Sequence, residues 1–228
     1  MIYAMSDLHG CFEKYSKMLL MIDLKENDTL YILGDIVDRG ADGIKIILDL
    51  ITRKNVIALQ GNHDYKAELM LNRLMESEEA TAKIKIDKQF AFWISDGGLP
   101  TYESFLRLEQ QEKLMVLNYL RKMPFSKMLI IDGKKYFLSH TVPEKEYMPE
   151  NPEQCRKKAL ILGEPDYEKI YFKDITLVTG HTPTILIDKH FQGKIWRGNN
   201  HIAIDCGAAF GNNLGCICLD TGEEFYVE

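Results

Sequence analysis

The chain has 228 residues, which is enough for one domain with a substantial buried core. Its composition is that of a globular protein, and a formal net charge of -6 argues against nonspecific nucleic-acid binding. No apolar run reaches the roughly 20 residues of a membrane-spanning helix, and the first residues show no signal-peptide pattern. Five cysteines at irregular spacing predict reduced thiols rather than a zinc ribbon. We therefore expect a cytoplasmic protein.

Strands alternate with amphipathic helices in the first third of the chain. Three short apolar runs predict strands, and hydrophobic residues at helical spacing follow each of them. The strands are expected at 2–5, 29–33 and 55–60, and the helices at 11–22, about 44–51 and about 67–74. This alternation predicts an α/β domain built on parallel strands.

The rest of the chain is predicted to hold a helical insert followed by β structure. Residues 76–123 are rich in Glu, Lys, Leu and Met, and their aromatic side chains are expected to pack in a core. A hairpin turn is expected at Asp132-Gly133. The strands are expected at 127–131, 135–138, 175–178, 184–187, 202–204, 215–219 and 224–227, with a polar excursion at 142–173 that contains a short helix near 154–162. We find no repeat or linker, so residues 1–228 are predicted to form one domain.

Residues typical of metal ligands follow five of the predicted strands. They are Asp7 and His9, Asp35, Asn62 and His63, His140, and His181. Ligands of an α/β sheet gather at the carboxyl ends of its strands, so these side chains are expected to converge. A single histidine at a strand end is more often a core or capping residue, but five such positions together favour a metal centre. The mixture of oxygen and imidazole donors suits Mn²⁺, Fe²⁺ or Zn²⁺ better than Ca²⁺ or Mg²⁺.

The heptapeptide GDIVDRG places Asp35, Asp38 and Arg39 in one short loop after a predicted strand. Carboxylates coordinate divalent cations, and an arginine can bind phosphate oxygens in a bidentate manner. A metal ion and a phosphoryl group would explain all three residues. Taken alone, the loop is equally consistent with a solvated surface turn.

Five motifs in a fixed order resemble a known enzyme family. D-x-H-G at Asp7, G-D-x-V-D-R-G at Asp35 and G-N-H-D at Asn62 lie about 27 residues apart, and S-H-T and G-H-T follow at His140 and His181. This series resembles the phosphoprotein-phosphatase branch of the calcineurin-like metallophosphoesterases, which includes the bacterial and lambda-phage-type serine/threonine protein phosphatases. The resemblance implies an α/β fold, namely a four-layer α/β/β/α sandwich with a two-metal centre between its sheets.

The resemblance also implies a role for each site residue. Asp7 and His9 would hold the first metal ion, Asp35 would bridge both, and Asn62, His140 and His181 would complete the second site. The ions are expected to be Mn²⁺, with Fe, Zn or Ni as alternatives, and a water that bridges them would attack the phosphorus atom. His63 would protonate the leaving oxygen, Asp38 would orient His63, and Arg39 would bind the phosphoryl oxygens together with Asn62.

The chain departs from the family pattern at a second phosphate-binding arginine. The run at 160–164, where the family often has this residue, contains none. Arg156 lies nearby and is either a substitute or part of a solvated helix face with Lys157 and Lys158. His190 and His201 fit no motif and are expected at the surface, and Asp205 is expected to have a structural role.

Several functions remain open at this point. We expect a metal-dependent phosphoesterase that acts on phosphomonoesters, above all a serine/threonine protein phosphatase with a phosphorylated protein or small phosphoester as its substrate. A symmetrical diadenosine-tetraphosphate hydrolase has similar motifs and is the alternative. A scaffold that has lost catalysis is disfavoured because all six ligand positions are filled, and the Asp38-Arg39 pair argues against a phosphodiesterase.

Overall fold

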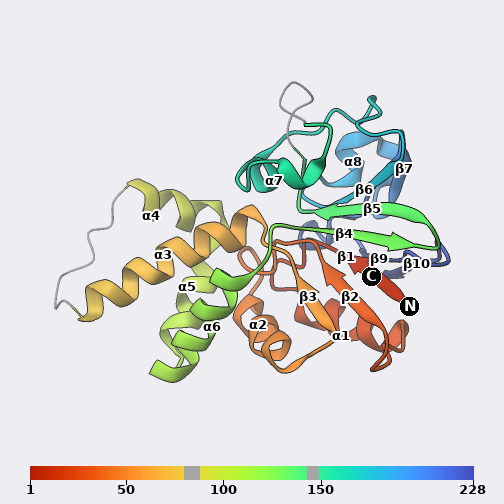
Figure 1. Cartoon of the computed structure of the whole chain (residues 1–228). Coiled ribbons are helices and arrows are strands. Elements are labelled where there is room, and N and C mark those ends of the chain that lie inside the picture. Colours follow the sequence, from red (N-terminus) through yellow and green to blue (C-terminus); the bar gives the residue numbers. More distant parts are fainter. Residues whose placement is uncertain (80–87, 143–148) are drawn as a thin grey trace.

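The computed structural model describes residues 1–79, 88–142 and 149–228 (Figure 1). The predicted insert at 76–123 and the predicted excursion at 142–173 therefore lie partly outside the described residues. The strands are β1 Ile2–Met5, β2 Thr29–Ile32, β3 Val56–Ala58, β4 Ser126–Ile131, β5 Lys134–Ser139, β6 Ile175–Thr179, β7 Trp196–Gly198, β8 His201–Ala203, β9 Leu214–Cys218 and β10 Glu224–Val227. The α-helices are α1 Phe12–Met21, α2 Gly43–Thr52, α3 Asn62–Glu79, α4 Lys88–Trp93, α5 Leu99–Leu106, α6 Gln110–Lys122, α7 Ala159–Leu162 and α8 Thr184–Ile187.

The strands form two mixed sheets. The first has the order β10-β9-β1-β2-β3, and the second has the order β4-β5-β6-β8-β7. The predicted parallel core is present, because β1, β2 and β3 are parallel to one another, as are β5, β6 and β8. Antiparallel strands β9 and β10 extend the first sheet beyond β1, and β4 and β7 form the edges of the second.

Alternating side chains place the two sheets face to face. In β1, Tyr3 and Met5 pack into the cluster beneath α1 and α2, whereas Ala4 belongs to the cluster between the sheets. In β5, Phe137 packs into the cluster beneath α7, and Leu138 faces the first sheet. Because successive side chains of a strand point to opposite faces, each sheet has helices on one side and the other sheet on its second side. The predicted four-layer α/β/β/α sandwich is confirmed (Figure 1).

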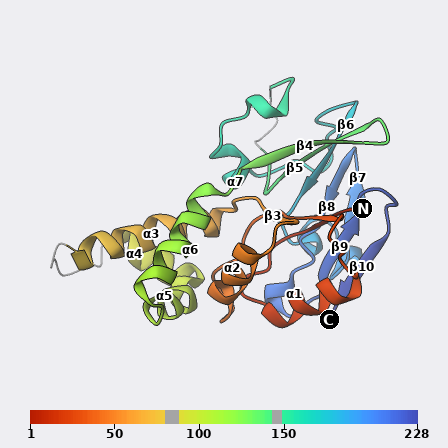
Figure 2. The same cartoon turned by 60° about the horizontal axis from the view of Figure 1, so that its bottom comes forward.

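Helices α3 to α6 form a lobe that projects from the side of the sandwich in both views (Figures 1 and 2). Phe90, Trp93 and Phe105 are buried there, as predicted for most aromatic side chains of the insert, whereas Phe92 is 59% exposed. A short π-helical segment, Ile94–Gly98, joins α4 to α5 and contains a kink at Gly97. The φ of Gly97 is 105°, a conformation that glycine adopts without steric strain. The buried side chains of the lobe belong to the same hydrophobic cluster as those between the first sheet and α1 and α2.

One predicted strand is wrong. Residues 184–187 form the helix α8 instead: Pro183 precedes its first turn, and the Asp188 backbone N–H donates to the Thr184 carbonyl at 3.0 Å. The short helix predicted near 154–162 is a 3₁₀ turn at Pro152–Gln154 followed by α7. All five cysteines are free thiols, and Cys206, Cys216 and Cys218 are buried. No helix within the described residues is both long and apolar enough to span a bilayer.

Candidate metal centre

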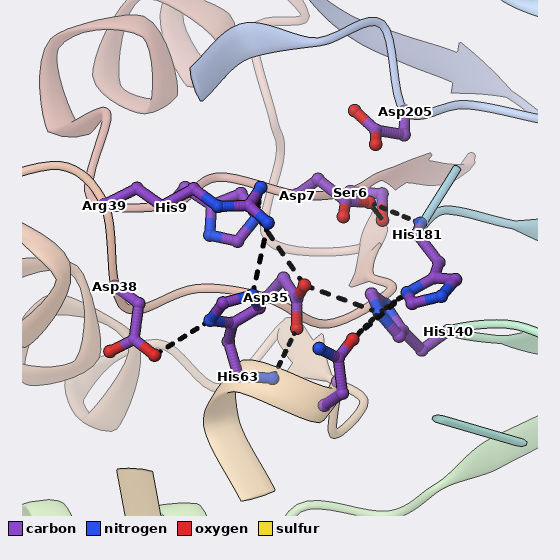
Figure 3. A network of polar contacts seen from close by, with 12 residues as sticks. Ser6, Asp7, His9, Asp35, Asp38, Arg39, His63, His140, His181 and Asp205 are labelled. Atoms are coloured by element: carbon purple, nitrogen blue, oxygen red, sulfur yellow. Dashed lines mark hydrogen bonds and ion pairs between the residues drawn. The ribbon is translucent and has the colours of Figure 1, made fainter. Parts of the chain in front are cut away.

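The predicted ligands converge at the carboxyl ends of strands from both sheets (Figure 3). Asp7 and His9 follow β1, Asp35 follows β2, Asn62 and His63 begin α3 after β3, His140 follows β5, and His181 follows β6. Loops after strands of the first sheet carry the residues from Asp7 to His63, and loops after strands of the second sheet carry His140 and His181. The site therefore exists only when the two sheets are packed against each other.

The backbone around the site is held in an uncommon conformation. Ten non-glycine residues in the described part of the chain have positive φ, and six of these belong to the site. They are Asp7, His9, Asp35, Asp38, Arg39 and His181. Such conformations persist only where surrounding contacts impose them, and they cluster at active sites. Here they turn the loops sharply enough for successive polar side chains to point toward one centre.

Asp35 lies at the middle of the cluster. Its Oδ2 atom is 3.5 Å from His9 Nε2 on one side and 3.5 Å from His140 Nε2 on the other. Its Oδ1 atom accepts a hydrogen bond from the His63 backbone N–H at 2.9 Å. Two groups of side chains share Asp35 and have donor atoms close enough to hold one ion each: His9, Asp35 and His63, and Asp35, His140 and His181. Both groups thus share Asp35, and its role as a carboxylate that bridges two cations stays a prediction.

Backbone carbonyl groups fix the tautomers of two histidines. His9 Nδ1 donates to the Val37 carbonyl at 3.0 Å, and His140 Nδ1 donates to the Leu33 carbonyl at 2.7 Å. Burial lowers the pKa of His9 to about 4 and also lowers that of His140, so both rings are neutral near pH 7. Each Nε2 atom therefore carries a lone pair and no proton. Metal-binding histidines usually donate their other ring N–H to a carbonyl or carboxylate oxygen in this way.

The other half of the cluster brings acceptor atoms together. His140 Nε2 lies 2.9 Å from Asn62 Oδ1 and 3.1 Å from His181 Nδ1, and these last two atoms are 3.1 Å apart. Burial lowers the pKa of His181 to about 4, so that ring carries a single proton. At most one proton, on His181 Nδ1, is available for these three contacts. A divalent cation would satisfy all three lone pairs, so the residues fit a metal ion here.

Asp7 lies beside this group. Its Oδ2 atom accepts hydrogen bonds from the Ser6 hydroxyl and, at 3.0 Å, from the His181 backbone N–H. Burial, followed by the charges of Asp205 and Asp35, raises the pKa of Asp7 well above its usual value. Three buried carboxyl groups close together are destabilising unless a cation offsets their charge. That Asp7 is a direct metal ligand stays a prediction.

His63, Asp38 and Arg39 form the opposite wall of the site (Figure 3). His63 Nδ1 donates to Asp38 Oδ2 at 2.9 Å. Burial acts to lower the pKa of His63, but the Asp38 hydrogen bond and the Asp35 charge outweigh it and raise the pKa. Arg39 contacts His9 Nε2 at 2.7 Å and His63 Nε2 at 3.2 Å, and its guanidinium lies over the Phe210 ring. That His63 acts as an acid, Asp38 as its support and Arg39 as an anion clamp stays a prediction.

Three buried residues hold the site but were given no role from the sequence. Asp64 accepts backbone N–H groups of the loop that carries Asp35, and Trp93 and Thr101 donate to Asp38. Asp64 is the last residue of the G-N-H-D motif, so the sequence did contain a signal that could have identified it. Trp93 and Thr101 lie in the helical insert, where nothing in the local sequence points to the site.

The structure corrects one of the minor predictions and agrees with two. His201 is buried rather than exposed, because β8 begins at this residue and its ring stacks on Tyr167, with the centroids 5.0 Å apart. His190 is exposed as expected. Asp205 accepts the Gly207 N–H at 2.9 Å, as a structural residue would, and burial raises its pKa to about 7. Arg156 is exposed, and within the described residues its side chain makes no hydrogen bond or ion pair.

Comparison with known proteins agrees with this geometry. The family model of the calcineurin-like phosphoesterases matches residues 1–210. The chain is 25% identical over 94% of its length to an asymmetrical bis(5'-nucleosyl)-tetraphosphatase of Anoxybacillus flavithermus, and 24% identical over 93% to serine/threonine-protein phosphatase 1 of Salmonella typhimurium. Each match covers 89% of the relative.

Other matches are shorter or show the fold alone. A symmetrical bis(5'-nucleosyl)-tetraphosphatase of Wigglesworthia glossinidia brevipalpis is 24% identical over 51% of this chain, and the match spans only 43% of that relative. A protein serine/threonine phosphatase structure from Saccharomyces cerevisiae covers the whole chain and 80% of its own length with a TM-score of 0.63, at 14% identity. The extent of the family match, together with the two-sheet fold and its convergent side chains, shows that the chain belongs to the calcineurin-like phosphoesterase family.

Proposed function

We propose that the chain hydrolyses phosphomonoesters with a pair of divalent transition-metal ions, preferably Mn²⁺, and that phosphoserine or phosphothreonine in a protein is its substrate. The observation that carries this proposal is the His63–Asp38 pair, which lies beside Arg39 and the Asp35-centred ligands. When bound, two such ions supply a water of lowered pKa and offset the charge of an in-line displacement.

The residues of the chain would divide the remaining work. Arg39, whose guanidinium contacts ring nitrogens of His9 and His63, would bind the phosphoryl oxygens as a fork. His63 would deliver a proton from Nε2 to the leaving oxygen. Asp38 holds the Nδ1 side of the same ring and stabilises the charged imidazolium. Asn62 and Arg39 would orient the substrate.

The nature of the leaving group favours a phosphomonoester. A serine or threonine alkoxide is a poor leaving group and needs a proton, which a buried His–Asp pair can provide. The leaving group of a dinucleoside tetraphosphate is a nucleoside phosphate anion, which departs without strong acid assistance. Hydrolysis of dinucleoside tetraphosphates remains the second candidate, and the names of two of the relatives favour it.

The first test is metal-dependent turnover. Metal-stripped protein supplied with Mn²⁺ should hydrolyse an aryl phosphate, and Asp35→Asn should abolish this activity together with metal binding. Asp132→Asn is a matched control, because Asp132 is exposed and has the same left-handed backbone conformation. Wild-type turnover by Asp35→Asn would contradict the proposed centre.

The second test separates the substrates and the role of His63. A phosphoserine peptide and diadenosine tetraphosphate should be compared at equal concentration, and the peptide should be hydrolysed with the larger kcat/KM. His63→Asn should lose most turnover of the peptide and keep its metal content. Loss of one equivalent of metal would instead make His63 a ligand, consistent with its place beside His9 and Asp35. Preferential hydrolysis of the dinucleotide would favour the second candidate.

A further inference from the structure

Two residues of the helical insert bind the carboxylate that supports His63. Trp93 Nε1 donates to Asp38 Oδ2 at 2.9 Å, and Thr101 Oγ1 donates to Asp38 Oδ1 at 2.8 Å. The Thr101 hydroxyl also accepts the Asp38 backbone N–H at 2.9 Å. We propose that Trp93 and Thr101 are positioning residues, which fix the Asp38 carboxylate so that His63 presents Nε2 to the leaving group. This proposal rests on the acid role of His63 proposed above.

The hydrogen bonds leave Asp38 little freedom to rotate. The indole N–H of Trp93 can only donate, so Asp38 Oδ2 accepts both this proton and the one on His63 Nδ1. Thr101 holds the second oxygen, which prevents the carboxylate from turning about its Cβ–Cγ bond. Asp38 is fully buried, so water is not an alternative partner. Hydrogen bonds to a charged group are among the stronger ones in proteins.

Trp93 itself is held in place by its surroundings. A Cβ atom on Gly98 would lie 2.4 Å from Trp93 Cε2, so only glycine allows the indole to lie against this backbone. On another side the indole makes an edge contact with Phe90, with 5.6 Å between the ring centroids. The side chain is 1% exposed. Its orientation toward Asp38 is therefore built into the packing of the insert.

The insert also contacts the neighbouring Arg39. The Arg39 backbone N–H donates to the Gly97 carbonyl at 2.7 Å, and Gly97 lies at the kink between α4 and α5. The same segment thus fixes two consecutive residues of the phosphate-binding loop. An insert that only covered the site would not need three hydrogen bonds to Asp38 and one to Arg39. The contacts instead indicate that the insert sets the geometry of the acid.

The test compares substrates that differ in their need for an acid. Thr101→Val and Trp93→Phe should lower kcat about 10-fold for phenyl phosphate and less than 2-fold for 2,4-dinitrophenyl phosphate, whose leaving group departs without a proton. Thr101→Ser keeps the hydroxyl and should restore wild-type turnover of both. Ser104→Ala removes an exposed hydroxyl from the same helix and should change neither. Metal content should be wild-type in every variant.

Parallel loss with both substrates, loss of metal, or failure of Thr101→Ser to recover would overturn the proposal, because a general structural defect gives these results. A crystal structure of Thr101→Val provides a readout that is independent of turnover. In it, the Asp38 carboxylate should be rotated and the distance from His63 Nδ1 should exceed the 2.9 Å of the wild type. A further outcome is that His63→Asn lowers turnover of both substrates equally while the Asp38 carboxylate is still rotated in Thr101→Val. In that case His63 is not the acid, but Thr101 does position Asp38. An unmoved Asp38 overturns the positioning role.

Discussion

Asp64 connects the start of α3 to the loop that carries Asp35, and its replacement by Asn should destabilise the fold. The carboxylate is fully buried and accepts four backbone N–H groups. Oδ2 accepts from Asp35 at 2.8 Å and Gly61 at 3.0 Å, and Oδ1 accepts from Ile36 at 2.9 Å and Val37 at 3.4 Å. An asparagine has one acceptor oxygen, so its NH₂ group must face two backbone donors in either orientation.

The expected loss follows from those two donors. A buried N–H group that loses its acceptor costs about 1–3 kcal/mol, so Asp64→Asn should lower the free energy of unfolding by about 2–6 kcal/mol. This is a large part of the roughly 5–15 kcal/mol that stabilises a typical domain. Because the loop carries Asp35, metal affinity should fall as well.

Urea unfolding of the metal-free protein measures this effect without interference from the ions. With a slope of about 2 kcal/mol per M, the unfolding midpoint of Asp64→Asn should fall by roughly 1–3 M. Asp23→Asn is the matched control, because Asp23 is an exposed residue with a φ of 46° that asparagine also adopts readily. If the two variants unfold within about 0.5 kcal/mol of each other, the four hydrogen bonds do not stabilise the loop.

Two further predictions concern packing and pH. Gly180→Ala should reduce both metal content and the unfolding temperature, because its Cβ would lie 1.8 Å from Ser6 Oγ and 2.1 Å from Asp7 Oδ2. Gly133→Ala meets open space and should cost only the roughly 1–2 kcal/mol of a left-handed alanine; equal effects in the two variants would contradict the expected clash. Burial lowers the pKa of His201 to about 3, so the unfolded chain binds a proton there below pH 6.5 and the folded chain does not. Stability is therefore lost as the pH falls from about 6.5 toward 3, and His201→Gln should flatten this dependence by up to about 1.4 kcal/mol per pH unit in urea titrations of the metal-free protein. An unchanged slope would rule out His201 as the source.

The convergence of the site could be predicted because it depends on local signals. Each ligand directly follows an apolar run, and the geometry of sheets brings strand ends together. Asp35 and His140 come from different sheets and lie 3.5 Å apart, although 105 residues separate them in the sequence. The layer order could be predicted only through the family resemblance, because strand patterns do not reveal how two sheets stack.

The contacts around Asp38 could not be predicted in the same way. Trp93 and Thr101 are 55 and 63 residues away from Asp38 in the sequence, and both lie in helices whose periodicity indicates only that they are buried. Whether the buried indole N–H of Trp93 reaches the Asp38 carboxylate depends on the packing of the insert. His201 was predicted at the surface because it fits no motif and lies just before the strand predicted at 202–204, whereas the ladder of β8 begins at His201 itself.

The position of β1 in the first sheet has a consequence for folding during synthesis. β1, which leads into Asp7 and His9, is a central strand that pairs with β2 on one side and with β9 on the other. A nascent chain that has not yet exposed residues 214–218 carries β1 as an open sheet edge, which is a template for aggregation. Long-range pairing of this kind is also slow to form. Ribosome-bound chains truncated before β9 should therefore be held by chaperones, and activity should appear only after the last strands emerge.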